Sequence, residues 1–112
     1  MIVLLEDLNK FEIWDAKVEF EDEPGKSKTR PVLIDSDGDM YILAYKITGT
    51  PPRPNFTGEY SIKFWKEAGL KKPSTVRLNR IVNIPKENLI RYRGHLQLID
   101  VRQVIKILNN IK

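Results

Sequence analysis

The chain has 112 residues, of which 41% are hydrophobic and 30% are charged, so we expect one globular domain spanning residues 1–112 rather than a disordered or membrane-embedded chain. It contains no cysteine, which excludes disulfides and thiolate chemistry and suits the reducing cytoplasm, where we expect the protein to reside. The net charge of +4 is uneven: residues 1–23 hold two bases and eight acids (2 − 8 = −6), and residues 24–112 hold seventeen bases and seven acids (17 − 7 = +10). The basic body fits a polyanionic partner or simply a soluble surface.

The amino-terminal segment is followed by an alternating pattern. Residues 2–11 fit either a short helix or an extended arm. From Phe11 to Phe20, apolar and charged residues alternate, which predicts a strand with one buried face and a bulge near Trp14.

A hairpin is predicted next. The run 29–35 contains Pro31, which cannot donate to a sheet ladder and therefore belongs at a strand opening or on an edge. The segment 36–39 contains an Asp-Gly pair, a strong signal for a tight turn, and residues 40–48 then form the third strand.

A loop with three prolines, residues 49–58, follows the third predicted strand and is long enough to have a function. The elements expected after it are a brief strand at 60–62, one or two helical turns at 63–70 ended by Gly69, a strand at 74–84 ended by Pro85, a strand at 89–93 and a closing helix at 97–111. The expected buried face of that helix comprises Leu98, Val101, Val104, Ile105, Ile107, Leu108 and Ile111. Together the elements predict a mainly β fold, a small antiparallel barrel over about residues 11–94 with a carboxy-terminal helix.

Two strand ends carry complementary polar groups. Arg30 opens the second strand just after Lys26 and Lys28, and Thr48 ends the third. An arginine fork beside lysines is suited to binding a phosphate. The alternative for Arg30 is an ion pair with a nearby carboxylate such as Asp35, and for Thr48 it is an ordinary strand-end position.

These motifs resemble a known family. The stretch Thr29-Arg30-Pro31-Val32-Leu33-Ile34, the later Ile47-Thr48, the segment Trp65–Leu78 and the ending Arg93-Gly94-His95-Leu96 are similar, in this order, to the PemK-like branch of the MazF/PemK toxins. The resemblance covers about residues 11–111.

The resemblance implies an SH3-like barrel of the CcdB/MazF type that forms a homodimer. It implies a type II toxin that cleaves single-stranded RNA without metal or cofactor, is neutralised by a cognate antitoxin, and does not act at a membrane. The catalytic pair falls on Arg30 and Thr48. Gly49 stands where the family has serine, and Val82 and Pro85 stand where some members have an additional arginine and aspartate.

Substrate contacts are expected from the loops around these strand ends. The candidates are Lys26, Ser27, Lys28, Lys46, Arg53 and Phe56, with Tyr45 as a further base-stacking candidate. Phe56 could equally anchor its loop to the core. His95 is the only histidine, which excludes a two-histidine ribonuclease mechanism, and its position favours a surface role.

Two alternatives to a ribonuclease stay open. The missing arginine and aspartate at positions 82 and 85 fit a non-catalytic nucleic-acid-binding module on the same barrel. A gyrase-directed toxin is the third possibility, because the CcdB toxins share this fold.

Overall fold

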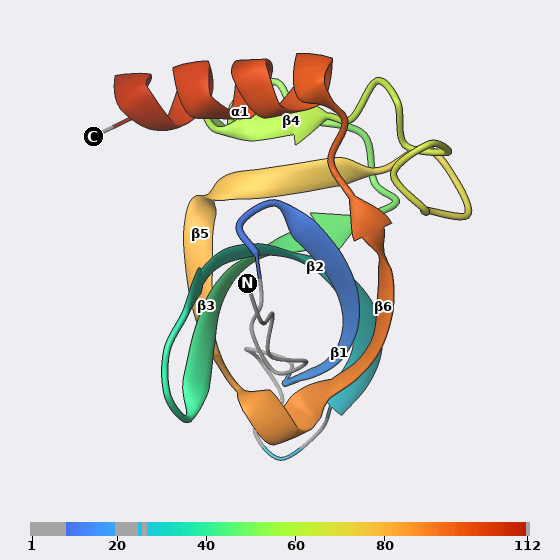
Figure 1. Ribbon diagram of the computed structural model, residues 1–112. Helices are drawn as coiled ribbons and strands as arrows, with labels where there is room; N and C mark the ends of the chain where they lie inside the picture. Colours follow the sequence, from blue (N-terminus) through green and yellow to red (C-terminus); the bar gives the residue numbers. More distant parts are fainter. Residues whose placement is uncertain (1–8, 20–24, 26, 112) are drawn as a thin grey trace, which may run out of the picture.

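The computed structural model describes residues 9–19, 25 and 27–111. In this part of the chain a single antiparallel sheet curls into a barrel, and a helix lies across one side of it (Figure 1). The elements are β1 (Glu12–Glu19), β2 (Ser27–Asp37), β3 (Tyr41–Thr48), β4 (Glu59–Ser61), β5 (Thr75–Pro85), the 3₁₀ turn η1 (Lys86–Asn88), β6 (Leu89–His95) and α1 (Leu98–Asn110).

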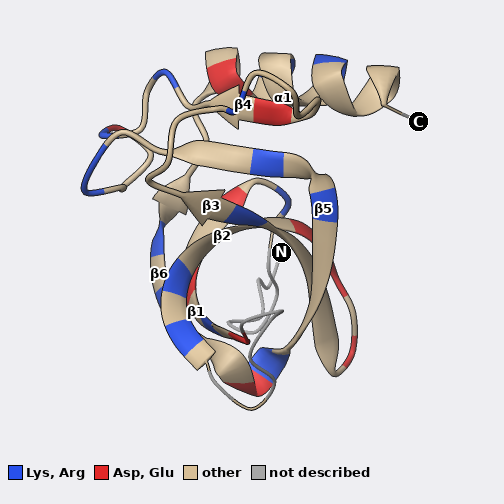
Figure 2. Cartoon of the chain, turned by 180° about the vertical axis from the view of Figure 1, so that it is seen from behind, with Lys and Arg blue, Asp and Glu red and all other residues tan. Residues whose placement is uncertain are grey.

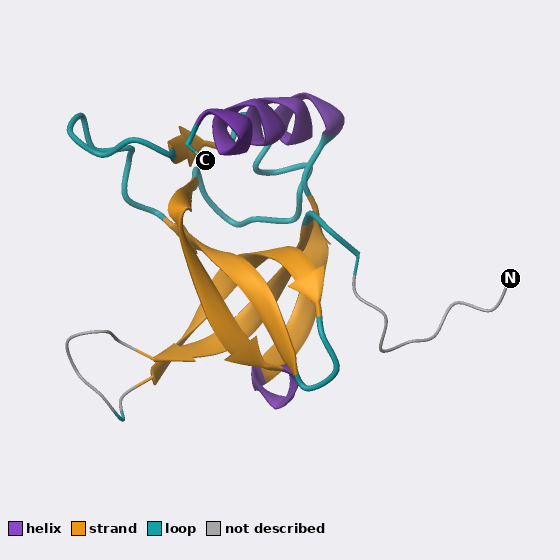
Figure 3. Cartoon of the chain, turned by 90° about the vertical axis from the view of Figure 1, so that its left-hand side faces the viewer, coloured by secondary structure: helices purple, strands orange, loops and turns teal. Residues whose placement is uncertain are grey.

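The strand order is β4-β5-β3-β2-β1-β6, so β4 and β6 lie at the edges of the sheet. The side view shows the crossed strands of the barrel, with α1 at one end and η1 at the other (Figure 3). The predicted fold class is therefore confirmed, as is the hairpin of β2 and β3. The expected bulge is also present, because the pairing of β1 with β6 shifts register on both sides of Trp14 and Asp15. Most of the predicted segment 2–11 lies outside the described residues, as does most of the chain between the first two predicted strands, residues 21–28.

Two hydrophobic clusters use opposite faces of the same strands. Val32 and Ile34 on β2 face the barrel interior, whereas Leu33 between them belongs to the cluster under α1. β3 alternates in the same way, with Ala44 inside and Tyr45 outside. Strands that are buried on both faces need a continuous apolar run, which explains why these two segments lack polar alternation.

The buried face of α1 differs from the expected one. Val104 and Asp100 are fully buried, whereas Leu98 and Ile105 are 64% and 43% exposed, and Ile111 is also exposed. The stripe that packs on the barrel is therefore centred on Val104 and its neighbours Val101, Ile107 and Leu108. Leu98 and Ile105 were expected to be buried because they are apolar. The helix is oriented instead by the hydrogen bonds that hold the Asp100 carboxylate in the interior.

The segment 62–74 connects β4 to β5 and lies over the end of β6. It contains a single helical turn, with the Ala68 N–H bonded to the Phe64 carbonyl at 3.0 Å. Gly69 has a φ of +93°, and a β-carbon there would lie 2.0 Å from the Arg93 carbonyl oxygen. Two backbones thus touch at this crossing, which is possible only because position 69 is glycine.

No helix among the described residues is long and apolar enough to cross a membrane.

Candidate functional site

Arg30 and Thr48, far apart in sequence, lie on neighbouring strands and line one pocket of about 340 Å³. β2 and β3 pair with Val32 opposite Lys46. Continuing this antiparallel register by two residues places Arg30 opposite Thr48. The predicted catalytic pair is therefore brought together at the end of β3. The Thr48 hydroxyl also accepts a hydrogen bond from the Thr50 backbone N–H at 3.3 Å, which orders the start of the following loop.

The pocket is strongly positive. Its described lining comprises Asp15, Lys28, Thr29, Arg30, Pro31, Ile47, Thr48, Gly49, Leu70, Lys71, Lys72, Ser74 and Arg93. These include five cations and one carboxylate. Coloured by charge, the chain shows basic positions along β6 and in the adjoining 62–74 segment (Figure 2). A concave site with this balance attracts a phosphodiester and stabilises additional negative charge on it.

A second arginine enters this pocket from β6, and sequence reasoning did not identify it. Arg93 is only 11% exposed, and its Nη1 lies 3.5 Å from the Asp15 carboxylate, which also binds Arg91 at 3.4 Å. The Arg93 Nε is buried and has no hydrogen-bond partner among the described residues. Asp15 and Ile13 are two residues apart on β1 and so share a face in the alternating pattern. Only the pairing of β1 with β6 shows that Arg93 lies beside Asp15.

Arg93 and Asp15 do not stand at the positions where some members of the family have an additional arginine and aspartate. Those positions hold Val82 and Pro85 in this chain. Val82 and Pro85 line a different pocket, of about 400 Å³, on the β3–β5 side of the barrel. Lys46 also lines that second pocket, so the structure does not bring it to Arg30 and Thr48 as expected. Lys46 and Thr48 are two residues apart and would share a face of a regular strand. The pairing of β3 with β5 shifts register between Tyr45 and Ile47, at Lys46, and this irregularity interrupts the alternation.

The 49–58 loop also places its two candidates away from the first pocket. Arg53 and Phe56 line a third depression of about 260 Å³, with Arg77 and Arg80. The Arg53 guanidinium lies 3.6 Å from the centre of the Phe56 ring and forms an ion pair with the nearly buried carboxylate of Glu59. The hydrogen bond from Arg53 holds the pKa of Glu59 below its usual value. These contacts fasten Arg53 to β4. Phe56 itself is 48% exposed and stacks on Arg53 of the same loop, so it neither lines the first pocket nor anchors the loop to the core.

Three candidates, Lys26, Ser27 and Lys28, lie around the start of β2 in the sequence, and of these Lys28 lines the pocket with Arg30. Ser27 pairs with Glu19 at the start of β2 and is not among the described lining residues. Lys26 lies outside the described residues. The structure therefore places Lys28 in the site and does not place Ser27 there.

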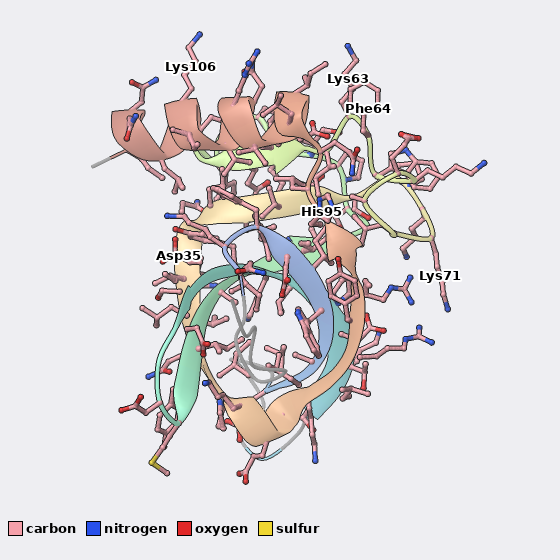
Figure 4. The ribbon with its side chains drawn as sticks, in the orientation of Figure 1. Asp35, Lys63, Phe64, Lys71, His95 and Lys106 are labelled. Carbon is pink, nitrogen blue, oxygen red and sulfur yellow. The ribbon has the colours of Figure 1, made fainter. Side chains whose placement is uncertain are left out.

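Tyr45 is not available for base stacking. It is 7% exposed in the cluster under α1, and its hydroxyl donates to Asp35 at 3.2 Å. Burial, reinforced by the Asp35 carboxylate, raises the pKa of Tyr45 to about 12. Asp35 is also 3.6 Å from the Lys10 ammonium, and Figure 4 places Asp35 on the side of the barrel away from Lys71. His95 is exposed and is not among the residues described as lining the pocket, in agreement with a surface role.

Comparison with known proteins assigns the chain to a family. Residues 9–111 match the family model described as "PemK-like, MazF-like toxin of type II toxin-antitoxin system". No curated protein matches the chain.

Solved structures show the same fold. The Mycobacterium tuberculosis toxin MazF-mt6 is 24% identical, with a TM-score of 0.69 over 88% of this chain and 93% of that one. An endoribonuclease in complex with its cognate antitoxin, from a mycobacterial species, is 16% identical, with a TM-score of 0.70 over 93% of each chain. A second mycobacterial endoribonuclease is 15% identical, with a TM-score of 0.66 over 90% of this chain and 86% of that one. Since the family model spans nearly the whole chain, the protein belongs to the PemK-like, MazF-like toxins of type II toxin-antitoxin systems.

Proposed function

We propose that the protein is an endoribonuclease that cleaves single-stranded RNA without a metal ion, at the pocket shared by Arg30 and Thr48. The observation that carries the proposal is the convergence of these two residues, from separate strands, in a pocket lined by five cations. Membership of the toxin family and the two structural neighbours named endoribonuclease support it further.

The chemistry asks the protein to stabilise charge on phosphorus. The ribose 2′-oxygen attacks the adjacent phosphorus, the O2′–P bond forms and the P–O5′ bond breaks. The 2′-hydroxyl proton leaves and the departing 5′-oxygen gains a proton. The phosphorane between these events carries more negative charge on its oxygens than the diester does, so donors fixed around it lower the barrier.

Arg30 is suited to this stabilising role. Its planar fork can donate two N–H groups to two phosphate oxygens at once, and a guanidinium carries a fixed positive charge. The Thr48 hydroxyl, which lines the same pocket as Arg30, can donate a third hydrogen bond. Lys28, at the same pocket, adds attraction for the RNA backbone.

The test is cleavage of a long single-stranded RNA by purified protein in the presence of a chelator. We expect discrete cuts, and a loss on the order of 10²–10³-fold in Arg30→Ala, the effect of removing one preorganised donor. Arg30→Lys keeps the charge but not the fork, so we expect it to recover only part of the rate. Arg102→Ala, which removes an exposed arginine on α1, is the matched control.

The result distinguishes the alternatives. If folded wild-type protein binds RNA but does not cut it, a non-catalytic binding module replaces the ribonuclease. If it neither cuts nor binds RNA, assays on supercoiled DNA would test a gyrase-directed toxin. Equal cleavage by wild type and Arg30→Ala would contradict the role of Arg30.

We also infer two protein partners, both acting in the cytoplasm. A cognate antitoxin is supported by the complex formed by the structural neighbour. A second copy of the chain is supported by an exposed apolar surface on β3 and β5, where Tyr41, Leu43 and Ile81 are 50%, 38% and 46% exposed. Light scattering of the purified chain would test the dimer, and a monomer at micromolar concentration would contradict it.

A further inference from the structure

Lys72 approaches the site from the 62–74 segment rather than from the barrel. Its backbone is fixed on both sides: Leu70 and Ser74 are each 6% exposed, and the Ser74 hydroxyl donates to the Lys72 carbonyl oxygen at 2.8 Å. The close crossing of Gly69 over the Arg93 carbonyl holds the same segment three residues before Lys72. The backbone that bears Lys72 is thus packed firmly against the rest of the protein.

The end of the Lys72 side chain lies over Gly49, the residue directly after Thr48. A β-carbon at position 49 would lie 2.7 Å from the Lys72 Cε and 2.9 Å from its Nζ. Both distances are shorter than van der Waals contact, so the lysine occupies the space that a side chain at position 49 would take. The ammonium is therefore next to the strand end that bears Thr48.

We propose that Lys72 is a further phosphate-binding residue of this site, and that glycine at position 49 is what admits it. The proposal rests on the ribonuclease function proposed above. Arg30 supplies a planar fork, whereas Lys72 supplies a compact charge with three N–H donors, which can follow the changing geometry at phosphorus. Both residues line the pocket that holds Thr48.

Lys71 provides an internal comparison. It lines the same pocket and carries the same charge, but its side chain hangs from the outer edge of the 62–74 segment (Figure 4). If only net charge mattered, the two lysines would be equivalent. Their distance from Gly49 distinguishes them, because the three described atoms nearest to a β-carbon at position 49 all belong to Lys72.

The experiment compares RNA cleavage by Lys72→Met, Gly49→Ala and the double variant. Lys72→Met keeps an unbranched side chain of similar length and removes its charge; we expect kcat/KM to fall on the order of 10²-fold. Gly49→Ala should lower cleavage similarly while leaving the melting temperature near that of wild type, because the atoms its β-carbon meets are the flexible end of a lysine. Since both changes remove the same contact, the double variant should be no slower than Lys72→Met alone.

Lys71→Met should cost markedly less than Lys72→Met. Lys106→Met, at an exposed lysine that projects from α1 away from the barrel in Figure 4, should leave cleavage unchanged. Binding of a fluorescent mixed-sequence single-stranded RNA provides a readout other than cleavage. The loss of one phosphate contact should reduce the slope of log affinity against log salt by about 0.7 in Lys72→Met.

The outcomes separate this inference from the proposed function. If wild type cuts RNA and Lys72→Met cuts equally well, the role of Lys72 is overturned and the ribonuclease stands. If Gly49→Ala slows cleavage further in the Lys72→Met background, the coupling of the two residues is overturned. If wild type binds RNA without cutting it and Lys72→Met weakens binding with the reduced slope, the ribonuclease fails and the phosphate contact stands. If wild type neither cuts nor binds RNA, both fall.

Discussion

Removing the Asp100 carboxylate should destabilise the protein strongly. Asp100 is fully buried at the start of α1, and its carboxylate accepts hydrogen bonds from the Tyr60 hydroxyl and from the backbone N–H groups of Lys63 and Phe64, the latter two at 2.9 Å. This one group joins the helix to the segment that follows β4. Asp100→Ala would leave three donors without their partner.

The magnitude follows from these contacts. A hydrogen bond to a charged group contributes about 1.5–3 kcal/mol, and unsatisfied buried donors add a desolvation cost. Because the contacts are not additive and water can enter, we expect the free energy of unfolding to fall by about 3–5 kcal/mol, a large part of the ~5–15 kcal/mol typical of a domain. Asp100→Asn retains one acceptor oxygen but turns an amide N–H toward a donor, so an intermediate loss is expected.

Urea denaturation followed by the fluorescence of Trp65, which packs against the cluster under α1, would measure the loss. Gln103→Ala, at an exposed position of the same helix, is the control and should change stability by less than about 0.5 kcal/mol. A loss below about 1 kcal/mol for Asp100→Ala would refute the reasoning, since it would mean that these hydrogen bonds are replaced at little cost.

Two further predictions concern backbone strain and titration. Gly69→Ala should cost at least 3 kcal/mol by thermal or urea unfolding, because its β-carbon would meet the Arg93 carbonyl at 2.0 Å. Gly25→Ala, at φ +89° with no atom of the described residues within 4 Å of the added β-carbon, should cost only the ~1–2 kcal/mol of a left-handed residue; equal losses would show that the backbone crossing is not tight. Because the pKa of Tyr45 is raised to about 12 in the folded state, above the ordinary ~10, its phenol stabilises the fold below pH 10 and this contribution is lost as the pH rises toward 12. Absorbance titration of wild type against Tyr45→Phe should show the missing phenol titrating near 12, and a midpoint near 10 would contradict burial beside Asp35.

Local patterns in the sequence were enough to predict most elements. The alternation in β1, the apolar runs of β2 and β3 and the Asp-Gly turn between them each reflect a constraint that acts within a few residues, so the first three strands and their hairpin could be predicted. The Arg-Pro pair at one strand opening and the Ile-Thr pair at another strand end marked two residues that line one pocket. Choosing Arg30 and Thr48 as the candidate catalytic pair required the family resemblance, because neither the Arg-Pro pair nor the Ile-Thr pair specifies chemistry by itself.

The rest of the site depends on contacts between distant parts of the chain. Arg93 reaches the pocket because β6 pairs with β1, and Lys72 reaches it because Gly69 allows one backbone to cross another. Likewise, the face that α1 buries follows from the hydrogen bonds of Asp100, which a count of apolar residues cannot detect. Periodicity in a sequence reports which residues avoid water, whereas the position of a charged group in a pocket is decided by which strands pair and which backbones touch, and only the tertiary structure contains that information.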